Sequence, residues 1–158
     1  MARESHTSCS LDLCYRQFHI FRKGLKNPFN EWNEKHVEQG FSFRPESVGI
    51  MTISESGILH IDVSQDAVIC DDAKRILEFK FTVPNNCIEI ATVTASCFYK
   101  IKRGDYKVRI QLSSQREGED LCRISFLPIA KDDDFPRYLK YDSSIIRPCG
   151  FDLHTVGA

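Results

Sequence analysis

Few residues in this sequence have types and spacings that could support chemistry. The most concentrated are the three acids Asp132, Asp133 and Asp134, in the segment KDDDFPRY, whose composition predicts a loop. Asp71 and Asp72 could supply a second half of a calcium site, but such a site needs about six or more oxygen ligands from several segments. The simpler interpretation is an exposed acidic loop, which is also what a protein that binds a basic cleft would present.

Catalytic motifs are absent from the sequence, which contains no GxGxxG, GxxxxGKS/T, HExxH or GxSxG pattern. His60 and Asp62 stand two residues apart, so they would share one face of a strand. A solvated strand face explains this pair better than an acid–base pair does. We therefore predict a protein that is not an enzyme and that binds no cofactor.

The seven cysteines form no metal or redox motif, since no two are spaced as CxxC and the five histidines make no ligand pattern with them. We predict reduced thiols that pack as small hydrophobic side chains, as is typical of intracellular proteins. The cysteines are Cys9, Cys14, Cys70, Cys87, Cys97, Cys122 and Cys149.

A nucleic-acid surface is the other chemistry that the sequence allows. Several basic side chains lie near one predicted hairpin, and Phe98 beside them could stack on a base. These basic residues are Lys100, Lys102, Lys107 and Arg109. The net charge of −1 gives no electrostatic support, and basic residues on hairpins also serve solubility and edge protection. A nucleic-acid-binding β module is therefore the alternative, and we expect no direct contact with nucleic acid.

The elements that must position these side chains are mostly strands. Apolar and polar residues alternate in RILEFKFTV (75–83), DYKVRIQL (105–112) and ILHIDV (58–63). Such alternation is typical of strands with one buried face. One helix, capped by Asn30 and ended by Gly40, interrupts this pattern. The sequence predicts a mainly β fold, an antiparallel β-sandwich of about seven to eight strands with one short α-helix.

Two turns predict hairpins between consecutive strands. Gly104 in Arg103-Gly104 supplies a positive φ, and asparagine in Asn85-Asn86 tolerates the left-handed region. Both hairpins keep apolar residues in phase on one face. The cross-strand pairs would be Tyr99 with Val108, Ile101 with Tyr106, Phe81 with Ile90 and Val83 with Ile88.

The segment Tyr15–Phe41 interleaves aromatic and basic residues. Its first part, YRQFHIF, is apolar on both sides, which favours a central strand covered by the helix. The basic residues that follow fall in the loop RKGLKNP, so aromatic and basic side chains are expected to separate in space. Trp32 should be substantially buried, packing the helix near Phe18 or Phe29.

With 158 residues, of which 42% are hydrophobic and 27% charged, the chain is long enough for a domain with a hydrophobic core. We expect a single domain over residues 1–158, with residues 1–10 as a loosely ordered tail. No stretch is apolar enough to cross a membrane, and the N-terminus lacks the apolar core of a signal peptide. A cytoplasmic location follows, and the oligomeric state stays open, since a homo-oligomer is compatible with the sequence.

Two segments carry a family resemblance. The first, Tyr15–Lys23, reads Y-x-Q-F-x-x-F-x-K/R and is followed by a proline-containing loop and a helix with Trp and acids that ends in Gln-Gly. The second is Phe81–Leu112, whose firmest point is the Arg103–Tyr106 turn, RGDY. Together with the helix they cover roughly 60 of 158 residues, and they resemble the competence protein J family, nuclease inhibitors of Bacillus-type bacteria. The acidic region from residue 131 onward and the residues before 11 are not matched.

This resemblance implies a non-enzymatic protein that binds a competence-type deoxyribonuclease used in DNA uptake. It would occlude a basic, metal-containing active site with acidic side chains in place of DNA phosphates. The resemblance supplies no contact residues, so we choose them by charge and by neighbouring apolar anchors in a loop stiffened by Pro136. The predicted contact residues are Asp132, Asp133, Asp134, Phe135 and Tyr138. A second acidic cluster, expected to matter less, contains Glu117, Glu119 and Asp120.

Overall fold

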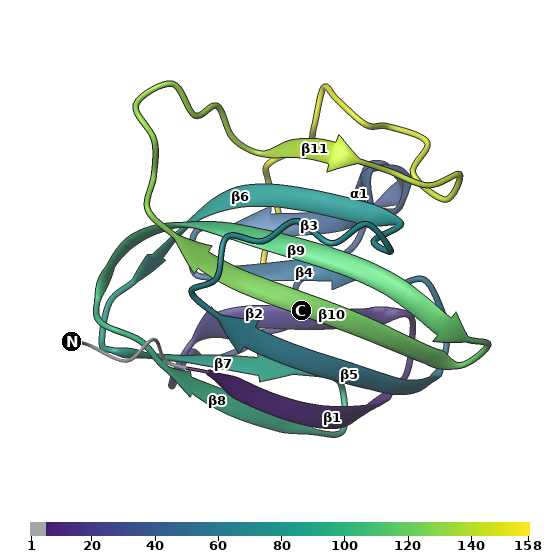
Figure 1. Cartoon of the computed structure of the whole chain (residues 1–158), viewed down its shortest axis with the longest axis horizontal. Helices are drawn as coiled ribbons and strands as arrows, with labels where there is room; N and C mark the ends of the chain where they lie inside the picture. The colour runs from purple at the N-terminus through teal and green to yellow at the C-terminus, as the bar shows by residue number, and fades with distance from the viewer. Residues whose placement is uncertain (1–5) are drawn as a thin grey trace.

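The computed structural model describes residues 6–158, and these form two β-sheets that face each other across a shared core (Figure 1). This confirms the predicted mainly β sandwich with a short α-helix. The strands are more numerous than predicted, with 11 in the described part of the chain. No helix within residues 6–158 has the length and apolar character needed to span a membrane.

The larger sheet has six strands in the order β1-β5-β10-β9-β6-β11. In that order they span Thr7–Leu13, Gly57–Ser64, Glu119–Leu127, Gly104–Arg116, Arg75–Val83 and Arg137–Lys140. Neighbours are antiparallel, except that β5 and β10 pair in parallel. Residues 7–10 were expected in a loosely ordered tail and instead begin β1, while residues 1–5 of that expected tail lie outside the described residues.

The smaller sheet has five strands in the order β3-β4-β2-β7-β8. In that order they span Phe41–Arg44, Ser47–Met51, Gln17–Arg22, Cys87–Ala91 and Ser96–Lys100. The central strand is β2, as its apolar faces predicted. Phe18 and Ile20 enter the core between the sheets. On the other face His19 and Phe21 are also buried, because the Phe29 ring covers them at centroid distances of 4.9 and 6.5 Å.

The two predicted hairpins are wrong, because each predicted turn carries the chain from one sheet to the other. Strands β6 and β9 belong to the larger sheet and β7 and β8 to the smaller one, so Asn85-Asn86 and Arg103-Gly104 lie at crossings. The turn residues adopt the expected conformations, with φ of 62° at Asn86 and 151° at Gly104. The side-chain oxygen of Asn86 accepts a 2.6 Å hydrogen bond from the backbone N–H of Arg103, which ties the crossings together.

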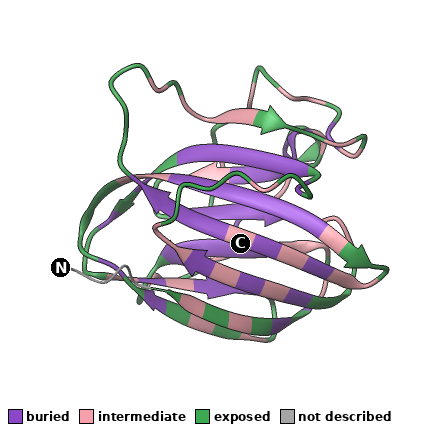
Figure 2. Cartoon of the chain, viewed as in Figure 1, coloured by how far each residue is buried: buried purple, intermediate pink, exposed green. Residues whose placement is uncertain are grey.

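Burial differs between the strands of the larger sheet (Figure 2). Buried residues alternate with more exposed ones along β5, whereas the first half of β6 and the middle of β9 are buried on both faces. The segment between β5 and β6 covers β9, since the Gln111 side chain accepts from Cys70 N–H at 2.8 Å and donates to Val68 O at 2.9 Å. As a result Glu78 and Arg109, which alternation placed on an exposed face, are only 0% and 8% exposed.

The helix α1 spans Glu34–Gln39, so it is shorter and starts later than predicted. Its N-cap is Asn33, whose side chain accepts a hydrogen bond from the first turn, and Gly40 ends it as predicted, with φ of 82°. Asn30 has another role, because its buried side-chain amide donates to backbone carbonyls of β3 and β4 at 2.9 and 3.0 Å. Asn30 therefore fixes the segment before the helix onto the smaller sheet.

Trp32 was predicted to be substantially buried on the helix. It instead precedes α1 and is only partly buried. Its ring meets His19 edge-on, with centroids 6.5 Å apart. Val37, on the helix itself, is 52% exposed. The segment 25–33 therefore covers the smaller sheet more than the helix does.

Candidate functional site

The predicted acidic loop connects β10 to β11 and covers residues 128–136. Asp132 and Asp134 are exposed on it, whereas the Asp133 side chain is only 7% exposed. The run of three acids is therefore divided, with two carboxylates at the surface and one turned toward the protein.

Asp133 fixes the loop through three contacts. Its carboxylate accepts a 2.6 Å hydrogen bond from Ala130 N–H and a 2.8 Å bond from the Arg137 guanidinium. The Lys107 ammonium on β9 lies 3.4 Å away. The Ala130 N–H and these two cations hold the pKa of Asp133 below its ordinary value. Asp133 is thus an ionised anchor of the loop and not a free surface charge.

A second carboxylate, that of Glu78 on β6, holds the other end of the loop. Glu78 is fully buried and lies 2.7 Å from Arg109 and 2.8 Å from Arg137. Because Arg137 also contacts Asp133, one guanidinium joins the loop to the sheet. A buried carboxylate is tolerated only with such partners. Both arginines pair with Glu78 here, and removal of one member of this network would destabilise the folded protein.

The two predicted apolar anchors have different surroundings. The half-buried Phe135 ring lies on the loop with the Arg137 guanidinium 5.3 Å from its centroid. Tyr138 packs inward against Phe41, and its hydroxyl donates a 2.6 Å hydrogen bond to Gln39 O. Burial raises the pKa of Tyr138. Tyr138 therefore supports the loop from below, and Phe135 is the aromatic ring beside the exposed acids.

The second acidic cluster is mostly occupied by internal contacts. Asp120 is fully buried and accepts hydrogen bonds from the Ser54 hydroxyl at 2.6 Å and from two backbone N–H groups after β4. Glu119 lies 2.8 Å from His60, and that hydrogen bond lowers the pKa of Glu119. Glu117 is exposed in the turn between β9 and β10. This cluster therefore offers a partner fewer free carboxylates than the loop does.

The basic residues of the nucleic-acid alternative do not share a face. Lys107 and Arg109 lie on β9 of the larger sheet, and both are engaged by carboxylates. Lys100 and Phe98 lie on β8 of the smaller sheet, and Lys102 is exposed in the connection between those strands. The shared basic face that this alternative requires does not form, because β8 and β9 belong to different sheets and make no hairpin.

No group of three or more His, Cys, Asp or Glu side chains within residues 6–158 is arranged to hold a metal ion. The two acidic half-sites considered for calcium are not brought together, and Asp72 pairs instead with an arginine of β10 at 3.3 Å. His60 and Asp62 bond to different partners, Glu119 and Ser8. They form no acid–base pair with each other in the described structure.

All seven cysteines, which lie within residues 6–158, are free thiols. Cys9 on β1 and Cys97 on β8 are neighbours where the edges of the two sheets meet, and a hydrogen bond between them lowers the pKa of Cys9. Burial raises the pKa of Cys122. Only Cys122 is buried among the seven, Cys149 is exposed and the other five are partly buried, so the predicted packing as small hydrophobic side chains holds only in part.

Sequence reasoning missed Glu78, Lys107 and Arg137 as the residues that position the loop. Arg137 stands four residues after Asp133, a spacing that could have suggested a local ion pair. Glu78 gave no usable signal, because strand alternation assigns it to the exposed face. Lys107 was considered only for nucleic acid.

These features define a two-sheet β protein that presents a short acidic loop fixed by an ion-pair network. The sequence profile of competence protein J (ComJ) matches residues 10–134. The match covers well over half of the chain, and the chain therefore belongs to the competence protein J family. The matched region ends inside the acidic loop at Asp134, so Phe135 and β11 lie beyond it.

Solved structures agree with this assignment at the level of the fold. The crystal structure of ComJ, inhibitor of the DNA degrading activity of NucA, from Bacillus subtilis, has a TM-score of 0.70 and 16% identity over 81% of this chain and 100% of that chain. The structure of crocagin biosynthetic gene J has a TM-score of 0.51 and 11% identity over 78% of this chain and 98% of that one. A comparison with curated protein sequences gave no match.

Proposed function

We propose that this protein is a non-enzymatic inhibitor that binds a competence-type deoxyribonuclease and occludes its active site. The observation that carries the proposal is membership of the competence protein J family over residues 10–134. The ComJ structure of Bacillus subtilis, described as an inhibitor of the DNA degrading activity of NucA, has the same fold. A role in bacterial DNA uptake and a cytoplasmic location belong to the same proposal.

The contact surface in this proposal is the acidic loop. Asp132 and Asp134 are its exposed carboxylates, and Phe135 is the ring beside them. Asp133 and Tyr138 act by positioning the loop, since both are held by internal contacts. A nuclease cleft that binds DNA phosphates is lined by cations, and exposed carboxylates on a fixed loop would take the place of those phosphates. Because the loop is already ordered, little conformational entropy is lost on binding.

The test is a DNA-cleavage assay with the cognate nuclease and the full chain. Inhibition that saturates near an equimolar ratio is expected for a protein that occludes the active site. Unchanged cleavage at a several-fold molar excess of this protein would show that the proposal is wrong. A mobility-shift assay at low salt serves as the control for DNA binding by the chain itself, where no shift is expected.

A calcium-binding or nucleic-acid-binding role is less well supported. The acids considered for calcium are separated, and the candidate basic residues lie on two different sheets. A melting temperature that rises with added calcium would instead favour a metal site.

A further inference from the structure

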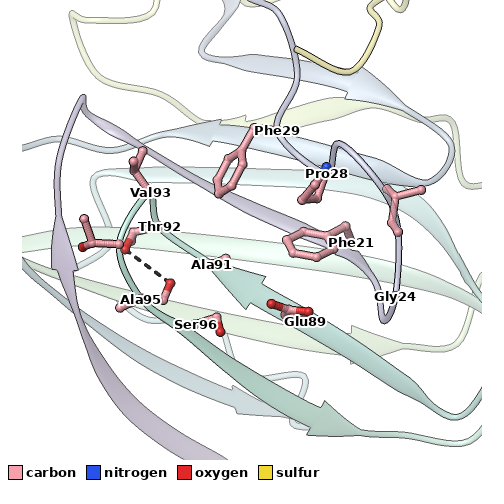
Figure 3. A pocket seen from close by; sticks show the side chains of 12 residues that line it. Phe21, Gly24, Pro28, Phe29, Glu89, Ala91, Thr92, Val93, Ala95 and Ser96 are labelled. Carbon is pink, nitrogen blue, oxygen red and sulfur yellow. Dashed lines mark hydrogen bonds between the residues drawn. The ribbon is translucent and has the colours of Figure 1, made fainter.

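A pocket of about 380 Å³ lies on the smaller sheet, on the face that points away from the core (Figure 3). It is bounded by β2, β7, the loop after β2 and the turn between β7 and β8. Its lining residues come from only two stretches of the chain, 21–29 and 89–96. The turn is closed by a 2.9 Å hydrogen bond from Thr92 N–H to Ala95 O, so this wall has a defined shape. The volume is at the lower end for small-molecule sites.

Glu89 is the charged side chain among the residues that line this pocket. Its neighbours on β7, Ile88 and Ile90, are fully buried in the core, so Glu89 points to the opposite face. The Glu89 side chain is itself partly buried, and within residues 6–158 its carboxylate has no hydrogen-bond or ion-pair partner. A carboxylate that has lost part of its water without gaining a counter-ion favours the binding of a cation.

Two phenylalanines flank Glu89 on the neighbouring strands. Phe21 on β2 and Phe98 on β8 are the residues directly paired with Glu89, so all three side chains lie on one face. Phe29 packs beside Phe21, with ring centroids 6.5 Å apart (Figure 3). Aromatic faces attract cations, and the Lys23 ammonium already lies 5.4 Å from the centroid of Phe98. This face of the sheet therefore already holds one alkylammonium group by this contact.

We propose that this pocket binds an alkylguanidinium or primary alkylammonium group, with Glu89 as its counter-ion and phenylalanine rings as its walls. A carboxylate and two phenylalanine rings among the lining residues suit a cation with an apolar stem, and they disfavour anions. The hydroxyls of Thr94 and Ser96 at the rim can bond the outer N–H groups of such a ligand. The cation is either a free small molecule or a lysine or arginine side chain of a partner protein, and the second source rests on the proposed inhibitor function.

The site itself is tested without any nuclease. The isotope-labelled full chain is titrated with n-butylguanidinium, and backbone amide signals are followed by NMR. Saturable shifts are expected at Glu89, Ala91 and Ala95, and binding should weaken as salt is added. The uncharged isostere n-butylurea should produce no such shifts. Equal responses to both compounds, or no saturable shift at these amides, would overturn the proposal.

The substitution Glu89→Gln removes the charge and keeps the shape, and it should weaken n-butylguanidinium binding at least tenfold. The matched control is Glu55→Gln, at an exposed position in the loop between β4 and β5, which should bind like the unsubstituted chain. Amide signals remote from the pocket show that both variants are folded. Undiminished binding by the Glu89→Gln variant would show that the carboxylate is not the counter-ion.

The two sources of the cation are then separated with the same variant. If Glu89→Gln also raises the inhibition constant toward the nuclease at least tenfold, the ligand is a basic side chain of that partner. If inhibition is unchanged while the unsubstituted chain binds n-butylguanidinium, the ligand is a free cation. Because the titration needs no nuclease, failure of the proposed inhibitor function would leave the test of the pocket intact.

Discussion

The guanidinium of Arg137 lies 2.8 Å from the buried carboxylate of Glu78 and 2.8 Å from that of Asp133, so one side chain joins the acidic loop to the larger sheet. Arg137 begins β11, and Asp133 lies in the loop just before it. The exposed acids of that loop are therefore displayed from a fixed base. Their proposed role as a contact surface would depend on this base as much as on their own charge.

Removing the carboxylate of Glu78 should destabilise the protein strongly. Glu78→Gln leaves Arg109 and Arg137 without their shared counter-ion, and we expect a loss of about 3 kcal/mol in the free energy of unfolding. Urea denaturation at neutral pH measures this change in the free energy of unfolding. The matched control is Glu38→Gln, which breaks the more exposed pair with Arg147 and should cost less than about 1 kcal/mol. Similar losses in both variants would mean that the buried network is no stronger than a surface pair.

The buried His19 should make stability fall in mild acid. Burial, and then the nearby Arg44, lower the pKa of His19 to about 3, so the folded protein keeps it neutral. In the unfolded chain His19 takes up a proton below its ordinary pKa of 6.5. Protonation therefore stabilises the unfolded state relative to the folded state as the pH falls. From pH 6.5 to pH 4.5 this one group should remove about 2 kcal/mol of stability.

The measurement for His19 is urea denaturation of the unsubstituted chain and of His19→Gln at both pH values. Glutamine can still accept the hydrogen bond that the His19 ring now accepts from Asn30 N–H at 3.0 Å. The variant should lose about 2 kcal/mol less on acidification than the unsubstituted chain does. Equal losses would show that His19 is not the group responsible.

Asn86 should be needed for its backbone conformation at the crossing from β6 to β7. Its φ of 62° is unfavourable for most residues, and its side chain bonds Arg103 N–H. Asn86→Ala should cost about 1–2 kcal/mol, while Asn86→Gly, which relieves the backbone but also loses the side-chain bond, should cost about 1 kcal/mol less. Thermal or urea unfolding compares the stability of the two variants with that of the unsubstituted chain. If glycine proves as costly as alanine, the hydrogen bond and not the φ angle is the dominant contribution.

The strands of this fold could be predicted from sequence, but their partners could not. Period-two alternation marks a strand with one buried face, and it does so equally well whether the next strand returns in the same sheet or crosses to the facing one. Asn86 and Gly104 have the φ angles expected of turn residues in both arrangements. The choice between them is made by contacts distant in sequence, such as the pairing of β6 with β9.

The candidate site was predictable only in part, because contacts distant in sequence also decide which of its side chains are exposed. Asp132 and Asp134 are exposed, as a run of acids in a loop suggests. Asp133 is identical in type and differs only because Lys107 and Arg137 happen to face it. Tyr138 is held by Gln39, which is 99 residues away in sequence. A charge pattern identifies the loop, and only the fold shows which members of it are free.

The most direct test of the account is the inhibition constant toward the cognate nuclease of the double variant Asp132→Asn, Asp134→Asn. This variant leaves the anchor Asp133 intact, and the control Glu55→Gln, Glu117→Gln changes the net charge equally at exposed positions elsewhere. We expect the loop variant to inhibit at least tenfold more weakly, about 1.4 kcal/mol, and the control to change inhibition less than about threefold. Equal effects, or a larger effect of the control, would contradict the assignment of the acidic loop as the surface that occludes the nuclease.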